Sequence, residues 1–361
     1  MRRPFAALSL GIALSFSADA QLVPILAYHE VDPEPQRGWC VRSEDFDEQL
    51  AFLAATQRSV IPIETLVDYI RGRRDSLPAD SVVITVDDGW LCAYTQMNAA
   101  LKQHDYPYSL YVYPKIVGTG SHALNWEQIR DLAAHGADVE SHTVTHPHLM
   151  RRSHPEMTDE QYSEWLRNEL VASKETIEKE VGHPVNVLAY PYGDHDAAVE
   201  REVARAGYAA ALTSEIGLNS RATNPMKLRR IPIESDTTLD QFRQRLGDAP
   251  LQLADCSIND GSIVSSSSIT LRVGDHFSTL HAGVLGRPMR TYEGDTISIP
   301  VDGLKPGRHR IVVWADDDNG RRHSAILTFY TSAAELARYE AMEKELSELP
   351  LHHATAAGES N

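Results

Sequence analysis

The chain has 361 residues, of which 42% are hydrophobic, and a formal net charge of −17. This acidity argues against nucleic acid or an anionic membrane surface as a partner, because both would repel the protein. The length suggests two domains or one large domain, and after the first twenty residues no segment is long and apolar enough to span a bilayer. Three cysteines are too few for a disulfide scaffold, although export would permit one bond, with Cys40 and Cys92 the first pair to try.

The first twenty residues have the pattern of a signal peptide. Arg2 and Arg3 give a positive start, residues 5–16 form an apolar core, and residues 18–20 form a small-residue cleavage site. We therefore expect cleavage after Ala20 and a periplasmic or secreted protein.

Strand and helix patterns alternate from residue 23 to residue 233, which we assign to one domain over residues 21–250. Runs of apolar and β-branched residues predict strands at 23–27, 60–63, 82–86, 109–113, 139–142, 185–190, 209–213 and 228–233. Helical spacing predicts helices at 46–53, 65–71, 94–103, 126–135, 159–180 and 197–206, with Ser43 as N-cap of the first. This alternation is typical of a parallel α/β fold, either an open sheet or a barrel.

The pattern changes near residue 250. Short alternating strands at 269–273, 296–301, 308–315 and 324–330 are separated by turns, which predicts a small all-β sandwich domain over residues 251–331. Residues 333–346 have a helical pattern, so residues 332–361 are expected to form a C-terminal helix and tail.

The strand at residues 82–86 ends in Asp87, Asp88 and Gly89. Parallel sheets carry their active sites at the carboxyl ends of strands. Two adjacent carboxylates repel each other unless a positive group lies beside them. On this stretch alone, a metal-binding pair and a simple acidic turn are both open.

His142 and His146 are four residues apart, so one helical turn would place both imidazoles on one side. Such a pair by itself is more often found as two ordinary surface or buried histidines. Together with one aspartate from a neighbouring strand end, the pair would form a facial set of three ligands. That set leaves positions open for water and substrate, as catalytic metal sites do.

These motifs together resemble those of the polysaccharide deacetylases, the NodB-homology fold of carbohydrate esterase family 4. Residues 85–89, Thr-Val-Asp-Asp-Gly, resemble the family's T-F-D-D-G motif, and residues 142–146 resemble its H-[ST]-x-x-H motif. Residues 190–193, Tyr-Pro-Tyr-Gly, resemble its proline–aromatic groove motif. The resemblance covers residues 23–233.

This resemblance implies a distorted (β/α) barrel with fewer than eight strands. It also implies removal of acetyl groups from N-acetylglucosamine polymers, or of O-acetyl groups from xylan in some members. Carried over by position, Asp88, His142 and His146 would hold the metal, and Asp87 would be the general base. Zinc is our first choice, and iron, nickel or cobalt would suit the same ligands.

Two departures from the family pattern concern the remaining catalytic groups. The arginine expected two residues before the groove proline is Ala189 here, and no Leu-x-His follows residue 233. Both features resemble the poly-N-acetylglucosamine deacetylase branch, in which the acid histidine comes from the first strand. Residues 25–29, Ile-Leu-Ala-Tyr-His, resemble that motif, so His29 is the predicted general acid, with a buried hydrogen-bonded histidine as the alternative. Pro191 and the backbone N–H of Tyr192 are expected to face the substrate and its oxyanion.

The predicted activity is therefore metal-dependent N-deacetylation of a polysaccharide that contains N-acetylglucosamine. Three alternatives remain: an O-acetyl esterase on the same fold, a non-catalytic glycan-binding protein, and an iron oxygenase that uses the same facial triad.

Overall fold

The computed structural model describes residues 21–318, 320–334, 336–337 and 340–341. The predicted signal peptide and most of the predicted C-terminal helix lie outside these ranges. Within them, no helix combines the length and the hydropathy that crossing a bilayer requires.

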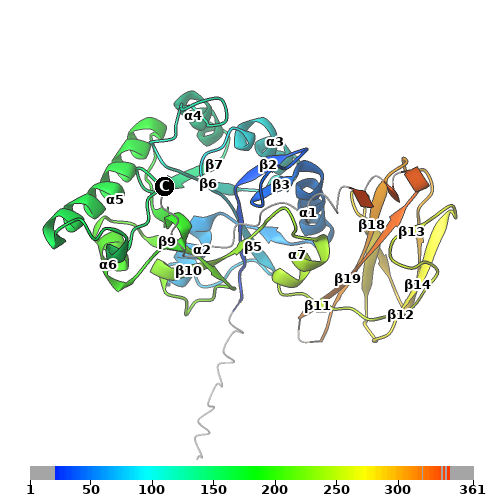
Figure 1. Cartoon of the computed structure of the whole chain (residues 1–361). Coiled ribbons are helices and arrows are strands. Elements are labelled where there is room, and N and C mark those ends of the chain that lie inside the picture. The colour runs from blue at the N-terminus through cyan, green and yellow to red at the C-terminus, as the bar shows by residue number, and fades with distance from the viewer. Residues whose placement is uncertain (1–20, 319, 335, 338–339, 342–361) are drawn as a thin grey trace, which may run out of the picture.

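In the described part of the chain, seven parallel strands close into a barrel (Figure 1). Their order around the ring is β1 (Ile25–Tyr28), β10 (Leu228–Pro232), β9 (Ala210–Ile216), β8 (Val187–Ala189), β7 (Ala137–Ser141), β6 (Tyr108–Val112) and β5 (Ser81–Val86). The first two residues of β5 pair with a short outer strand, β4 (Ser59–Val60), and its last four pair with β1, which closes the ring. The predicted distorted (β/α) barrel is thereby confirmed.

Most residues of the barrel strands are buried on both faces, which explains the continuous apolar runs. Ile25, Val83 and Tyr111 share one apolar cluster with side chains of β8 and β9. The residues that alternate with them along the strands, such as Leu26 and Ile84, pack against helices.

The helices are α1 (Ser43–Ala55), α2 (Ile63–Ile70), α3 (Asn98–Gln103), α4 (Trp126–Ala134), α5 (Asp159–Val181), α6 (Ala197–Arg205) and α7 (Leu239–Arg245), with a π-helical turn, η1 (Ala93–Met97), before α3.

Several local predictions were wrong. Arg42 is the N-cap of α1, whereas Ser43 is its first helical residue and donates from Oγ to Gln96. The strand predicted at 60–63 ends at Val60, because Pro62 begins the entry into α2 and Ile63 faces the core as part of that helix. Helix α7 was not predicted, although Thr238 and the glutamine three residues later form a capping box.

Two further sheets follow the barrel and face one apolar core. One contains β15 (Leu280–Val284), β16 (Arg290–Tyr292), β18 (Arg308–Asp316) and β19 (Arg322–Tyr330), with β11 (Ala249–Pro250) and β13 (Ser262–Ile263) along β19. The other contains β12 (Leu253–Cys256), β14 (Ser268–Val273) and β17 (Thr296–Pro300). Ile269 and Ile299 from the second sheet share a cluster with Ala282 and Val313 from the first. Strands β15 and β16 were not predicted. We call residues 249–330 the β module.

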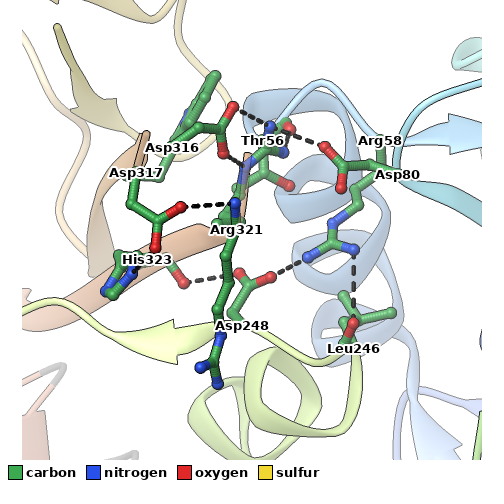
Figure 2. Close-up of polar contacts among 12 residues, drawn as sticks. Thr56, Arg58, Asp80, Leu246, Asp248, Asp316, Asp317, Arg321 and His323 are labelled. Atoms are coloured by element: carbon green, nitrogen blue, oxygen red, sulfur yellow. Dashed lines mark hydrogen bonds and ion pairs between the residues drawn. The ribbon is translucent and has the colours of Figure 1, made fainter. Parts of the chain in front are cut away.

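Buried polar contacts attach the β module to the barrel beside α1 and α7 (Figures 1 and 2). Arg58 forms an ion pair with Asp248, whose second oxygen accepts a 2.7 Å hydrogen bond from Ser324 Oγ on β19. From β18, Trp314 Nε1 donates to the carbonyl of Ala55 at the end of α1, at 2.8 Å. These groups have little access to solvent, so the module is packed onto the barrel over a desolvated surface.

Arg322 extends the same contact. Its guanidinium pairs with Asp80 of the barrel at 2.8 Å and with Asp316 of the β module at 2.9 Å, and it donates to the carbonyl of Thr56. It also lies over the ring of Trp314 at 4.1 Å from the centroid. One buried cation therefore joins both parts of the chain.

The cysteines are free thiols in the structure, so Cys40 and Cys92, the first pair to try for a disulfide, are not bonded. Cys92 Sγ instead accepts a hydrogen bond from the Val31 amide at 3.4 Å. Burial raises the pKa of Cys40 to about 12 and that of Cys92 to about 11. Both thiols are therefore protonated near neutral pH and are poor nucleophiles.

Candidate active site

The predicted site residues lie at the carboxyl ends of barrel strands. His29 follows β1, Asp87 and Asp88 follow β5, His142 follows β7, and Pro191 comes two residues after β8. Because parallel strands of a barrel end at one rim, these elements bring the residues together from distant parts of the chain.

The two aspartates after β5 lie in different environments. Asp87 is 1% exposed, whereas Asp88 is partly exposed and has a φ of +75°. Gly89 continues the turn with a φ of +78°, and a Cβ there would lie 3.2 Å from Val112 Cγ1. The turn therefore directs the adjacent carboxylates to different partners.

Asp88, His142 and His146 form a compact set of possible metal ligands. One ligand atom from each lies within 4.8 Å of the others. The two histidine Nε2 atoms are 3.1 Å apart, and each is 3.6 Å from Asp88 Oδ1. The structure thus places the three predicted ligands around one point.

The backbone that carries the two histidines is a loop, so the expected helical turn was wrong. Residues 142–146 follow β7 without helical structure. Thr143 and His146 have φ values of +67° and +56°, and Thr143 Oγ1 accepts a 3.1 Å hydrogen bond from the His146 amide. These left-handed residues turn the chain so that both rings face the same side.

The chemistry of this set fits a divalent metal ion. His142 Nδ1–H donates to the Ala189 carbonyl at 2.7 Å, which leaves its Nε2 lone pair directed at the set. Burial lowers the pKa of both histidines, that of His146 to about 3, so both are neutral and able to bind metal. Ligands about 2.0–2.1 Å from one ion lie roughly 3 Å or more apart, which agrees with the separations observed here.

Asp87 is held by an arginine that the sequence analysis missed. Arg230, buried on β10, donates from Nη1 to both Asp87 oxygens at 2.8 and 2.7 Å, and its Nε donates to the Thr213 carbonyl at 3.0 Å. Burial alone would raise the pKa of Asp87, but the charge and hydrogen bonds of Arg230, together with the nearby His142 and His29, outweigh burial and hold the pKa below its usual value. The carboxylate is therefore ionised. The available signal was a pair of arginines, Arg229 and Arg230, inside a predicted strand.

His29 lies beside this base. Its Nε2 is 3.9 Å from Asp87 Oδ2, and its side chain is 30% exposed. That distance is longer than a hydrogen bond, and the exposed ring can meet a molecule that enters from solvent. The catalytic role of His29 stays a prediction.

The groove motif forms a single 3₁₀ turn, η3 (Pro191–Gly193). Tyr192 has a φ of +57°, and its half-exposed ring stacks on His148 and meets His146 edge-on, with centroids 4.2 and 4.6 Å apart. Gly193 is required, because a Cβ there would lie 2.7 Å from the Ser214 amide. Backbone N–H groups in the first turn of a helix have no partner within it, so the Tyr192 N–H is a candidate donor.

Two more side chains near the ligands were not singled out by the sequence. Tyr113, directly after β6, has its ring 5.1 Å from that of His146. Asp194 accepts a 2.6 Å hydrogen bond from His148 Nδ1 and so steadies the ring on which Tyr192 stacks. The signal for Tyr113 was the same as for the predicted residues, namely a polar group just after a barrel strand, whereas Asp194 follows the groove motif.

Backbone strain is concentrated at this site. Seven non-glycine residues in the described ranges have positive φ, and four belong to the site: Asp88, Thr143, His146 and Tyr192. Conformations of this kind cost free energy and persist where surrounding contacts hold them, commonly at functional sites.

A cavity of about 330 Å³ lies beside Trp90, two residues after Asp88. It is lined by Glu30 of β2 (Glu30–Asp32), Cys40 of β3 (Cys40–Arg42), Arg37 and Trp90. Trp90 Nε1 also donates to Asp88 Oδ2 at 3.0 Å. The indole therefore orients Asp88, one of the three possible metal ligands, and forms part of the cavity wall.

The sequence model of the family described as polysaccharide deacetylase matches residues 74–211, which contain both aspartates, both histidines and the groove motif. Over these residues the chain is similar to the polysaccharide deacetylase family. YxkH of Bacillus subtilis (strain 168), named as a polysaccharide deacetylase, is 24% identical over 212 residues, which cover 58% of this chain and 71% of that protein. His29 and Arg230 lie outside the part that the family model matches.

A poly-beta-1,6-N-acetyl-D-glucosamine N-deacetylase of Escherichia coli (strain K12) is 24% identical over 258 residues, which cover 61% of this chain and 38% of that protein. The solved structure of the Streptococcus pyogenes deacetylase PplD in complex with acetate superposes with a TM-score of 0.56 at 23% identity. It covers 63% of this chain and 99% of that one. This structural likeness agrees with the barrel of the deacetylase family.

Proposed function

We propose that this deacetylase is a metal-dependent hydrolase that removes N-acetyl groups from a polysaccharide containing N-acetylglucosamine. The observation that carries the proposal is the ionised, buried Asp87 beside the ligand set of Asp88, His142 and His146. The name of the Escherichia coli relative supports the choice of an N-acetylglucosamine polymer.

A divalent ion held by Asp88, His142 and His146 would lower the pKa of a water molecule and polarise the amide carbonyl. Zinc is our first choice, and iron, nickel and cobalt would suit the same donors.

Asp87 is suited to accept the proton of the attacking water. Arg230 keeps the carboxylate charged and fixes its orientation. The same pairing makes Asp87 a weak base, so it can take a proton only from an acidified water. This requirement explains why a low-pKa aspartate would work beside a metal site.

His29 is suited to protonate the leaving nitrogen, because a histidine exchanges protons readily near neutral pH. It lies beside Asp87 at the exposed rim. The Tyr192 N–H would donate to the oxyanion, and Pro191 fixes the turn that presents this group. An amine is a poor leaving group unless it is protonated, whereas an alkoxide from an ester depends less on an acid. A histidine in this position therefore favours amide over O-acetyl ester hydrolysis.

Acetate release from β-1,6-linked N-acetylglucosamine oligomers, compared with acetylated xylan, tests the proposal. The enzyme is assayed as isolated, after a chelator, and after added Zn²⁺, with metal-loaded Asp87→Asn as the control for contaminating activity. We expect metal-dependent release from the amino-sugar oligomers. Release from xylan alone would favour the O-acetyl esterase, and binding without release would favour a glycan-binding protein.

We further propose that the protein is exported. The support is the leader pattern of the first twenty residues, and mass spectrometry of the mature N-terminus would test it. A protein found only in uncleaved form in the cytoplasm would contradict this proposal.

A further inference from the structure

A buried carboxylate on α5 contacts the loop that joins the two histidine ligands. Helix α5 is rich in charged residues, and most of them are exposed to solvent. Glu169 differs because it is 3% exposed and is directed toward the barrel rim. A buried glutamate needs hydrogen-bonding partners, and it finds them in the histidine loop.

The carboxylate makes three contacts with two consecutive residues. Glu169 Oε2 accepts hydrogen bonds from the backbone amides of Val144 and Thr145, both at 2.9 Å. Glu169 Oε1 accepts one from Thr145 Oγ1, also at 2.9 Å. Three hydrogen bonds of normal length from one buried side chain make this contact a firm anchor for the loop.

A second side chain of α5, one helical turn further on, extends this anchor. Ser173 Oγ donates to the Thr143 carbonyl at 2.9 Å and lies 2.8 Å from Ser141 Oγ. Tyr208 OH in turn donates to Ser141 Oγ at 2.9 Å. Residues 141, 143, 144 and 145 are thus all held by hydrogen bonds from α5 or its immediate neighbours.

We propose that Glu169 is a positioning residue that fixes the separation and orientation of His142 and His146 for metal binding. Left-handed backbone at Thr143 and His146 is unfavourable for residues with a side chain, so the loop would relax without an external anchor. Glu169 holds the two residues midway between the ligands and compensates for that strain. This inference rests on the proposed function only in taking the three-residue set as a metal site.

Zinc affinity measured without substrate tests the role, by competition with a chromophoric chelator on the full-length apo protein. Glu169→Ala should weaken Zn²⁺ binding by roughly 10–100-fold, as loss of a supporting hydrogen-bond partner does at other metal sites. Glu169→Gln should retain most of the affinity, because its amide oxygen can accept both backbone N–H groups and its NH₂ can donate to Thr145 Oγ1. Glu175→Gln, at an exposed position of the same helix, is the matched control and should bind like wild type.

Thermal unfolding of each apo protein separates positioning from general stability. If Glu169→Ala fails to fold, Glu169→Asp replaces it, since the shorter side chain withdraws the carboxylate from the loop and should also weaken Zn²⁺ binding. Wild-type affinity in a folded Glu169→Ala or Glu169→Asp protein would overturn the proposal, even if its Tm had fallen. The Zn²⁺ affinities are measured without substrate. They would therefore remain valid evidence for the role of Glu169 even if the protein released no acetate from N-acetylglucosamine oligomers.

Discussion

Arg230 Nη1 donates to both carboxylate oxygens of Asp87 past the intervening strand β1, joining residues that are 143 positions apart in the chain. Both side chains are almost fully buried. The expected catalytic base is therefore part of a buried ion pair, and its proton affinity depends on a residue of the last barrel strand.

Replacing Arg230 with Gln should shift the acid limb of the kcat/KM profile to higher pH. Without the guanidinium, burial raises the pKa of Asp87, so the base becomes protonated at a pH where the wild-type carboxylate is charged. The free energy of unfolding should also fall by about 3–5 kcal/mol, because a buried charge loses its partner. Arg230→Lys keeps a positive charge but lacks the planar guanidinium, so it should shift the acid limb less than Arg230→Gln does. If the acid limb of the Arg230→Gln profile stayed at the wild-type pH, Asp87 would not be the group that accepts the proton.

Asp87→Asn should keep the metal and lose activity by roughly 10²–10⁴-fold, because the amide has a similar shape but cannot accept the proton. Asp88→Asn should instead weaken metal binding itself. Metal content measured by elemental analysis, together with turnover, distinguishes the two variants. Near wild-type turnover of metal-loaded Asp87→Asn would exclude Asp87 as the base.

His29→Ala should bind metal normally and lose roughly 10²–10⁴-fold in turnover on amides. The loss should shrink on an activated ester, whose leaving group needs no proton. Paired assays on an N-acetylglucosamine oligomer and an aryl acetate measure this difference. An equal loss on both substrates would leave His29 with a structural or substrate-orienting role.

Asp138 on β7 should make the protein less stable as pH rises. Burial and the nearby Glu64 raise its pKa from 3.8 to about 6, so between these values the folded state holds a proton that the unfolded state has lost. Stability linked to Asp138 is complete below pH 3.8 and declines as pH rises to about 6. Asp138→Asn keeps an oxygen acceptor for Ser109 Oγ and should remove this decline. Urea unfolding of the wild type and of Asp138→Asn at pH 4.5 and 7 measures this decline. If the free energy of unfolding fell equally in both proteins, Asp138 would not be its cause.

The β module should depend on Asp248 for its attachment. Asp248→Asn leaves Arg58 buried without its counter-charge and should cost about 3–5 kcal/mol of unfolding free energy. Asp255→Asn, at an exposed position of β12, is the control and should change stability by less than about 0.5 kcal/mol. Equal stability of the two variants would show that the polar contact contributes little.

Much of the fold could be predicted because it depends on local patterns. Apolar runs mark strands that are buried on both faces, and the polar groups after them mark the rim of the barrel. Asp88 and His142 could be placed together by this rule alone, before any coordinates.

Other features depend on contacts between distant residues. Arg230 lies in a strand pattern that gives no sign of its partner on β5, and Glu169 looked like one more charge on a solvated helix. The histidine spacing suggested a helical turn, whereas a loop with left-handed residues places both rings on the same side. Strands β15 and β16 were missed because their short sequences, with Gly283 and Arg290, do not alternate clearly.

The closure of the barrel also has a consequence for biosynthesis. Strand β1 pairs with β5 and with β10, so the first strand of the ring completes its hydrogen bonding only when the last strand has been made. A nascent chain that ends before Arg230 lacks the cation that Asp87 requires, and it leaves one edge of β1 open. The proposed catalytic site is therefore complete only in a chain that extends through β10, which ends at residue 232. A partly synthesised chain would be unable to hydrolyse acetyl groups.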